Sequence, residues 1–121
     1  MNWLIEHPLT VRFSDCDLLG HVNNSRYLTY LEEARIALWL AQIGLRDPSA
    51  AKAGPRGQSF ILARTEIDFV AQAKFPDALV VQVALEGFGR TSVRYAHEIV
   101  RVADEVVVAR AKTVQVWFDY D

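Results

Sequence analysis

The chain has 121 residues, and its 13 Lys and Arg against 15 Asp and Glu give a formal net charge of −2. This length suits one globular domain, residues 1–121, and 51% hydrophobic residues supply enough apolar surface for a core. Nucleic acids and anionic membranes are bound by clustered positive charge, which this composition does not offer. We therefore expect no nucleic-acid partner and no membrane partner.

The cysteine content and the first residues bear on location. Cys16 is the one cysteine of the chain, so no disulfide can form within it. The opening MNWLIEHPLT lacks the basic start and the long apolar run of a secretory signal. No apolar run reaches the roughly 18 to 20 residues that a membrane-spanning helix needs. These features predict a cytoplasmic protein.

A long helix is predicted from Asn23 to Ile43. Asn23, Asn24 or Ser25 can cap its free amides, and Gly44 can end it in the left-handed conformation. Apolar residues recur at spacings of three and four and extend around most of the helix. We therefore expect it to be largely buried. The segment that follows, Gly44–Gln58, has the Gly and Pro content of a loop.

Five segments have the pattern of strands. In the second of them, the alternate residues from Ile61 to Phe69 form one apolar face. The five are Leu9–Ser14 before the helix, then 61–69, Ala78–Leu85, Ser92–Val102 and Glu105–Phe118, with turns at Gly87-Phe88-Gly89 and Ala103-Asp104 between the last three. One helix and about five strands predict an α+β domain in which a curved antiparallel sheet wraps around the helix. Its open edges favour pairing of two chains, sheet edge to sheet edge.

Polar groups gather in the stretch FSDCDLLGHVNNSRYLTYLEEAR, which starts at Phe13. If the strand period continues, Asp15 and Asp17 point to one side and Cys16 to the other. A helix N-terminus has unpaired amides and a partial positive charge, so it can stabilise an oxyanion. A carboxylate beside such a helix end is a minimal site for acyl transfer. Asp, Gly and Asn are equally what an ordinary turn and helix cap would use.

This stretch resembles the signature of hot-dog-fold thioesterases of the hydroxybenzoyl-CoA thioesterase type. In that family an Asp-x-Asp pair, two residues and a glycine precede an asparagine-containing cap, an aromatic residue and a long central helix. The matching residues here are Asp15, Asp17, Gly20, the cap His21-Val22-Asn23-Asn24, and Tyr27. The resemblance implies a single hot-dog domain, hydrolysis of an acyl-CoA to free acid and CoA, and a homodimer or homotetramer. It implies no metal and no cofactor, since coenzyme A is part of the substrate.

The resemblance also implies roles for individual residues. Asp17 would be the catalytic carboxylate, as nucleophile or as general base on water. The amides near Val22, Asn23 and Asn24 would contact the thioester carbonyl. Gly20 and Tyr27 would adjoin the substrate. Apart from the resemblance, the apolar helix residues Tyr27, Leu28 and Leu31 are candidates to line an acyl pocket near the helix start, although most such residues are expected to be core.

His21 has two interpretations. Plant acyl-ACP thioesterases, which share the fold, have a similar Asp…His-Val-Asn-Asn-x-x-Tyr stretch in which the aspartate and the histidine both matter. Asp17 and His21 match it, although Leu19 stands where those enzymes place asparagine. The alternative function is therefore an acyl-ACP thioesterase that uses both residues. In the other interpretation, His21 is a turn residue that hydrogen-bonds the helix cap.

Coenzyme contacts and further alternatives rest on single residues. By resemblance, Arg90, Thr91 and Ser92 would contact CoA phosphates, although one arginine after a turn is also ordinary. Cys16 is expected to be structural, because neighbouring carboxylates disfavour its thiolate. Glu32 and Glu33 are expected to face solvent on the polar strip of the helix or to form ion pairs with Arg35 and its neighbours. A non-catalytic protein that binds acyl thioesters is a third candidate, whereas the usual residues of a hot-dog dehydratase are not evident.

Overall fold

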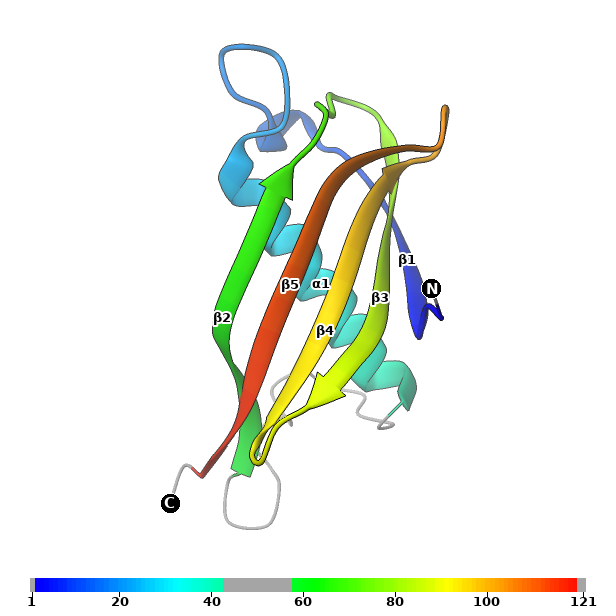
Figure 1. Ribbon diagram of the computed structural model, residues 1–121. Helices are drawn as coiled ribbons and strands as arrows, with labels where there is room; N and C mark the ends of the chain where they lie inside the picture. Colours follow the sequence, from blue (N-terminus) through cyan, green and yellow to red (C-terminus); the bar gives the residue numbers. More distant parts are fainter. Residues whose placement is uncertain (1, 43–57, 120–121) are drawn as a thin grey trace.

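The computed structural model describes residues 2–42 and 58–119, so nearly all of the expected loop Gly44–Gln58 lies outside the described residues. One strand, one helix and four strands follow each other along the chain, as predicted, with a short 3-10 turn between the first two (Figure 1). The elements are β1 (Ile5–Thr10), η1 (Phe13–Asp15), α1 (Asn24–Gln42), β2 (Gln58–Phe69), β3 (Ala78–Phe88), β4 (Ser92–Arg101) and β5 (Val106–Asp119).

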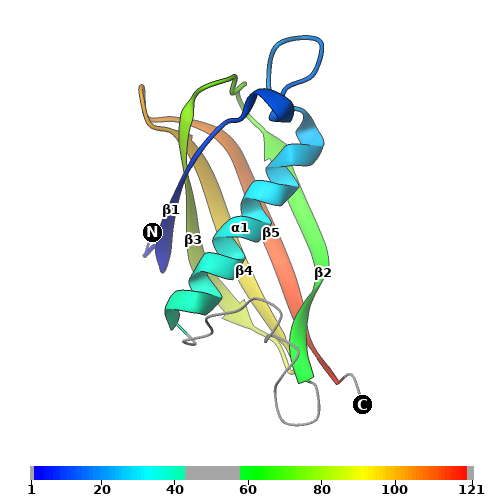
Figure 2. The same ribbon diagram turned by 180° about the vertical axis from the view of Figure 1, so that it is seen from behind.

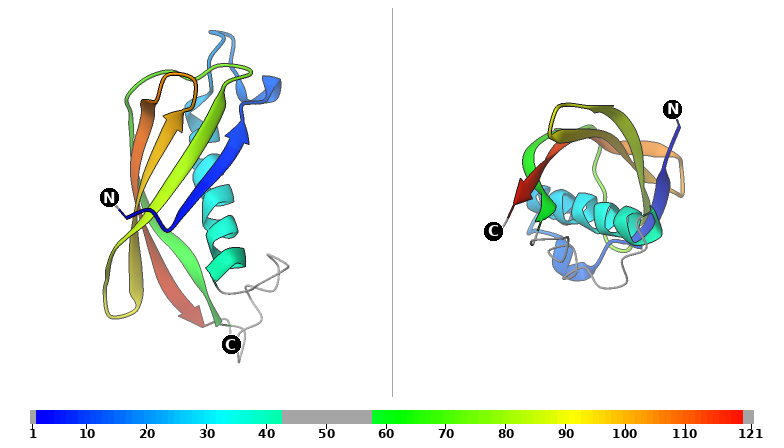
Figure 3. Two further views of the ribbon diagram at one scale, coloured as in Figure 1. Left: turned by 90° about the vertical axis from the view of Figure 1, so that its right-hand side faces the viewer. Right: turned by 90° about the horizontal axis from the view of Figure 1, so that it is seen from below.

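The strands form one antiparallel sheet of five strands in the order β1-β3-β4-β5-β2. The last three strands form the expected meander, and β1 and β2 occupy the two edges. Viewed from one end, the sheet curves around α1 and holds it on the concave side (Figure 3). This arrangement confirms the predicted α+β fold.

The helix crosses the concave face obliquely, from the end of β2 towards β1 (Figure 2). Its buried side chains form one stripe at helical spacing: Tyr27, Tyr30, Leu31, Ala34 and Leu38. The expectation that most of the circumference is buried is wrong, because the sheet covers one side only and Leu28 is 47% exposed. In the described part of the chain, no helix is long and apolar enough to cross a membrane.

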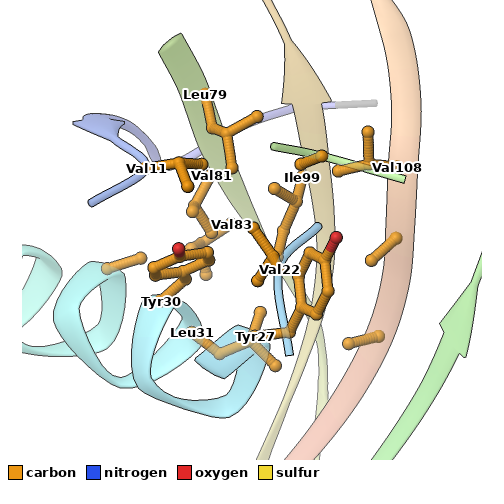
Figure 4. Packing of buried hydrophobic residues seen from close by; sticks show 14 of the residues in the cluster. Val11, Val22, Tyr27, Tyr30, Leu31, Leu79, Val81, Val83, Ile99 and Val108 are labelled. Atoms are coloured by element: carbon orange, nitrogen blue, oxygen red, sulfur yellow. The ribbon is translucent and has the colours of Figure 1, made fainter. Parts of the chain in front are cut away.

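The core lies between this stripe and the inner face of the sheet (Figure 4). Val81 and Val83 of β3, Ile99 of β4 and Val108 of β5 are buried there. Val11 and Val22, which flank the polar loop before the helix, join the same cluster. Both ends of that loop are therefore anchored in the core.

Three strand predictions need correction. β3 continues to Phe88, so Gly87 and Phe88 lie in the strand and the turn follows at residues 89–91. The first strand ends at Thr10 rather than Ser14. The chain turns at Phe13–Asp15 because the Asp15 carboxylate accepts the backbone N–H of Arg12 at 3.0 Å. In β2, a bulge between Leu62 and Arg64 shifts the register. Ile61 therefore does not share a face with Phe69, since one extra residue exchanges the two sides of a strand.

Candidate active site

The loop between Cys16 and Val22 is a tight hairpin, closed by an antiparallel bridge between those two residues. Gly20 N–H donates to the Asp17 carbonyl at 3.0 Å, and Asp17 N–H donates to the His21 carbonyl at 3.1 Å. Gly20 has φ +85°, a conformation that glycine adopts without strain. A turn followed by a left-handed glycine is a common way to close a three-residue hairpin loop. The Asp-Leu-Leu-Gly sequence therefore fixes where Asp17 lies.

The side chain of Asp15 holds the start of this loop in place. This side chain is buried and accepts the Tyr30 hydroxyl at 2.7 Å, as well as the Arg12 backbone and guanidinium at 3.0 and 3.3 Å. Burial raises the pKa of the Asp15 carboxyl, but these hydrogen bonds outweigh that effect, so the pKa lies below its ordinary value. Asp15 and Asp17 do not face the same side, because the 3-10 turn interrupts the strand period.

Asp17 is exposed at the loop surface. One of its carboxylate oxygens, Oδ1, accepts the N–H of Leu19 at 2.9 Å. Among the residues that the structure describes, no group donates to the second oxygen. The side chain is thus oriented by one bond and keeps one oxygen available to a substrate or a water molecule.

Asn23 caps α1. Its side-chain oxygen accepts the Ser25 backbone N–H at 3.0 Å and the Ser25 hydroxyl at 2.9 Å. Two of the three amides proposed for the carbonyl contact are already used in the fold: Val22 N–H donates to Ala73, and Asn23 N–H donates to Asp15. Over residues 2–42 and 58–119, the amide of Asn24 donates to no protein group, so it is the one available to an oxyanion.

A groove of about 760 Å³ lies beside the loop, lined by Gly20 and His21 on one side. Its other walls are the β2–β3 connection, including Lys74, and the end of β4 at Arg101 with the turn that follows. The Arg101 guanidinium already donates hydrogen bonds within the protein, two of 2.9 Å to Asp104 and a third to the Gln72 carbonyl. The sequence did not indicate this part of the site, since Arg101 is distant from the motif along the chain.

Tyr27 is placed in the core rather than beside the exposed loop. Its ring packs against those of Tyr30 and Phe69, and it is hydrogen-bonded to the backbone of Ala73. Burial, the main cause, raises the pKa of the Tyr27 hydroxyl. Tyr27 therefore belongs to the core and is not among the residues that line the groove beside His21.

Arg90 and Thr91 lie in the β3–β4 turn and Ser92 begins β4, at the opposite end of the sheet from the Asp17 loop (Figure 1). The 11 residues of β3 separate the two ends, which corresponds to about 36 Å at 3.3 Å per residue. Within one chain these residues do not form one site with Asp17.

The chemistry that the loop offers is that of a carboxylate and a helix N-terminus. Within the described residues, no group of three or more His, Cys, Asp or Glu side chains is arranged to hold a metal ion. Cys16 is half-buried and packs against the core. Glu33 lies 4.0 Å from His7, and Glu32 lies 3.9 Å from Arg35.

Solved structures share this architecture. A thioesterase from Thermus thermophilus, complexed with coenzyme A and Zn, is 30% identical, with a TM-score of 0.80 over 98% of this chain and 82% of that one. A candidate acyl-CoA thioesterase from Xanthomonas campestris is also 30% identical, with a TM-score of 0.85 over 99% and 97% of the two chains. A 1,4-dihydroxy-2-naphthoyl-CoA thioesterase from Synechocystis, 24% identical over 96% and 82%, shares the fold with a TM-score of 0.83. The fold is that of the hot-dog thioesterases.

A sequence family agrees with this class. The model of the thioesterase-like superfamily matches residues 11–121, and the chain belongs to that superfamily. The chloroplastic acyl-acyl carrier protein thioesterase ATL3 of Arabidopsis thaliana is 25% identical over 119 residues. This chain spans about 60% of the length of that relative.

Proposed function

We propose that the protein hydrolyses acyl-CoA thioesters to a free acid and CoA, with Asp17 as the catalytic carboxylate. Membership of the thioesterase-like superfamily supports the reaction class. The observation that carries the proposal is the position of Asp17. Its carboxylate is exposed, has one oxygen available, and is held by a closed loop directly before the N-terminus of α1.

This geometry is compatible with either of two roles for Asp17, general base or nucleophile. As general base, the carboxylate takes a proton from water while the water oxygen attacks the carbonyl carbon; the C–S bond then breaks, and the thiolate takes the proton. As nucleophile, an oxygen of Asp17 attacks the carbonyl carbon, the C–S bond breaks and CoA leaves as a thiolate. Water then hydrolyses the mixed anhydride, which releases the acid, regenerates the Asp17 carboxylate and supplies the proton that the thiolate takes. In both routes the carbonyl oxygen becomes negative, and the Asn24 amide at the helix end would stabilise it. The proposal needs no cofactor, because the thioester is already activated.

The test is thiol release from acyl-CoAs of short, long, branched and aromatic acyl groups. Asp17→Asn keeps the shape of the side chain and removes its charge, so we expect turnover to fall by about 10²-fold or more. Asp68→Asn, which changes an exposed aspartate on β2, is the matched control and should keep wild-type turnover. Undiminished activity in Asp17→Asn would refute the assignment. Saturable binding without thiol release from any acyl-CoA or acyl-ACP would favour a non-catalytic binding protein.

The carrier is proposed to be coenzyme A rather than acyl carrier protein. Two relatives at 30% identity support CoA, one solved with the coenzyme and the other a candidate acyl-CoA thioesterase. The Arabidopsis relative and the match at Asp17 and His21 favour the alternative. Rates on one acyl group presented on each carrier decide between them. A further loss in His21→Ala that appears only with acyl-ACP would support the second carrier.

We further propose that two chains join through the outer edge of β2. Within the described residues that edge pairs with no strand, and Ile61, Leu62 and Phe69 on β2 are more than one-third exposed. A two-fold axis that pairs β2 antiparallel to its copy would bring the Asp17 end of one chain to the Arg90 end of the other. The phosphate role of Arg90, Thr91 and Ser92 is proposed in that context, from the partner chain.

A further inference from the structure

A second hollow lies between α1 and the inner face of the sheet, and it opens to the surface where Leu28 and Leu62 are exposed. Its volume is about 260 Å³, and it shares no lining residue with the groove beside His21. Leu28 and Leu62 supply part of an apolar wall. The remaining wall includes Arg35 from the helix with His97, Thr113 and Gln115 from β4 and β5.

Three nitrogen atoms on this wall are buried without a hydrogen-bond partner in the described residues: Arg35 Nε, His97 Nδ1 and Gln115 Nε2. His97 is 3% exposed and Gln115 is 2% exposed, so neither side chain reaches bulk water. A buried donor without a partner destabilises the fold. Three such atoms around one cavity are therefore better explained by a ligand than by packing.

All three groups can donate at the same time. Arg35 donates only and keeps its positive charge. Burial, with a smaller contribution from Arg35, lowers the pKa of His97 to about 4, so the ring is neutral near pH 7. His97 Nε2 lies 2.9 Å from the Thr113 hydroxyl. If that hydroxyl donates to Nε2, the proton of the neutral ring is on Nδ1, the ring nitrogen that has no partner in the described residues.

The charge balance favours an anion. Glu32 is the nearest acid to Arg35, at 3.9 Å, but its side chain is 59% exposed and solvent weakens the pair. A carboxylate offers two oxygens with several acceptor sites. Ligand pockets usually measure about 300–1,000 Å³. A cavity of about 260 Å³ therefore fits a small acid or the end of a longer ligand.

We propose that this cavity binds a carboxylate, whose oxygens accept hydrogen bonds from Arg35, His97 and Gln115 while its apolar part contacts Leu28 and Leu62. The carboxylate has two possible sources. It is either a free small acid or the far end of an acyl group in a thioester substrate, and the second source rests on the proposed hydrolase function.

The binding test uses benzoate and hexanoate, with benzamide and hexanamide as neutral probes of the same shape. We expect the acids to raise the Tm of the full chain with saturation, and the amides to have no effect at equal concentration. Because this measurement needs no turnover, its result does not depend on whether Asp17 is catalytic. The absence of a saturable shift, or equal shifts for acid and amide, would show that the cavity holds water only.

Two variants test whether Gln115 and Arg35 bind the carboxylate. Gln115→Leu removes an unpaired polar group, so we expect it to fold with an unchanged or higher Tm and to weaken acid binding at least tenfold. Arg35→Met keeps most of the side-chain length and removes the charge, with the same expected loss. Gln82→Leu on β3, a glutamine outside the cavity, is the matched control and should bind as wild type. Wild-type binding in both cavity variants would overturn the proposal.

A second measurement separates the sources. Glutaryl-CoA and pentanoyl-CoA have acyl chains of equal length, and only the first ends in a carboxylate. A lower KM for glutaryl-CoA that approaches the pentanoyl-CoA value in Arg35→Met identifies the acyl end as the ligand. Equal KM values together with benzoate or hexanoate binding identify a separate site for a free acid.

Discussion

Two aspartates, two positions apart, have opposite environments in this protein. Asp15 is buried and bonded to Tyr30 and Arg12, whereas Asp17 is exposed and bonded to one backbone amide. The first holds the loop and the second faces solvent. A carboxylate with several donors resists protonation, while one with a free oxygen can act on a substrate. The two aspartates of the pair therefore differ in role: Asp15 holds the loop in place, and Asp17 is the candidate catalytic group.

The anchoring role of Asp15 predicts a coupled loss of stability. Asp15→Ala leaves the Tyr30 hydroxyl buried without an acceptor, so we expect the free energy of unfolding to fall by about 3 kcal/mol. Tyr30→Phe removes one hydrogen bond and should cost about 1–2 kcal/mol. Urea unfolding of both variants and of the double variant forms a cycle, in which the double variant should lose less than the sum. Simple additivity would show that the 2.7 Å contact contributes nothing of its own.

At this scale the sequence predicted part of the site. The motif indicated Asp17, Gly20 and the asparagine cap, because turn chemistry and helix capping are local. It could not show that Asp15 turns inward, since that depends on Tyr30 of the helix. Nor could it show that the Val22 amide is used by Ala73, because Ala73 belongs to the β2–β3 connection.

At the scale of elements, the inner face of the sheet changes in character along β4. Ile99 lies in the apolar core, whereas His97, two residues earlier, lines a polar cavity with Thr113 and Gln115 of β5. The number of strands and their order along the chain were predicted correctly, because alternation and turn residues are local signals. The bulge in β2 and the polar cavity were not, because they depend on which strands become neighbours.

Burial of His97 predicts a dependence of stability on pH. Its pKa is lowered to about 4, mainly by burial and secondarily by Arg35, from an ordinary value of 6.5. Between these values the unfolded chain binds the proton and the folded chain does not, so stability is full above pH 6.5 and falls towards pH 4. The total loss would be about 3 kcal/mol.

The measurement is urea unfolding at pH 7.5 and 5.0. We expect wild type to lose about 2 kcal/mol between them through this group. In His97→Gln, the loss of unfolding free energy between the two pH values should be smaller than in wild type by about 2 kcal/mol. His7→Gln, a control at a histidine of β1, should behave as wild type. An identical pH dependence in His97→Gln and wild type would contradict the prediction.

At the scale of the whole molecule, the two candidate substrate contacts lie at opposite ends. The Asp17 loop lies at one end of the sheet, and the turn with Arg90 at the other (Figure 1). The sequence indicated both segments but not their separation, because distance across a fold depends on strand direction. The proposed isologous dimer would bring the two segments together, since a two-fold axis beside β2 exchanges the ends.

This arrangement predicts that dimerisation and CoA affinity depend on the same edge. Light scattering should give a mass of at least twice 13.7 kDa for wild type. Ile61→Lys places two like charges near the proposed axis, so we expect it to shift the mass towards the monomer and to raise the KM for acyl-CoA. Leu4→Lys changes another exposed apolar residue, just before β1 at the opposite edge of the sheet, and should leave the mass and KM unchanged. A monomeric wild type with full activity would show that each chain binds its substrate alone. Arg90 would then have no part in the site, because within one chain the Arg90 turn lies about 36 Å from the Asp17 loop along β3.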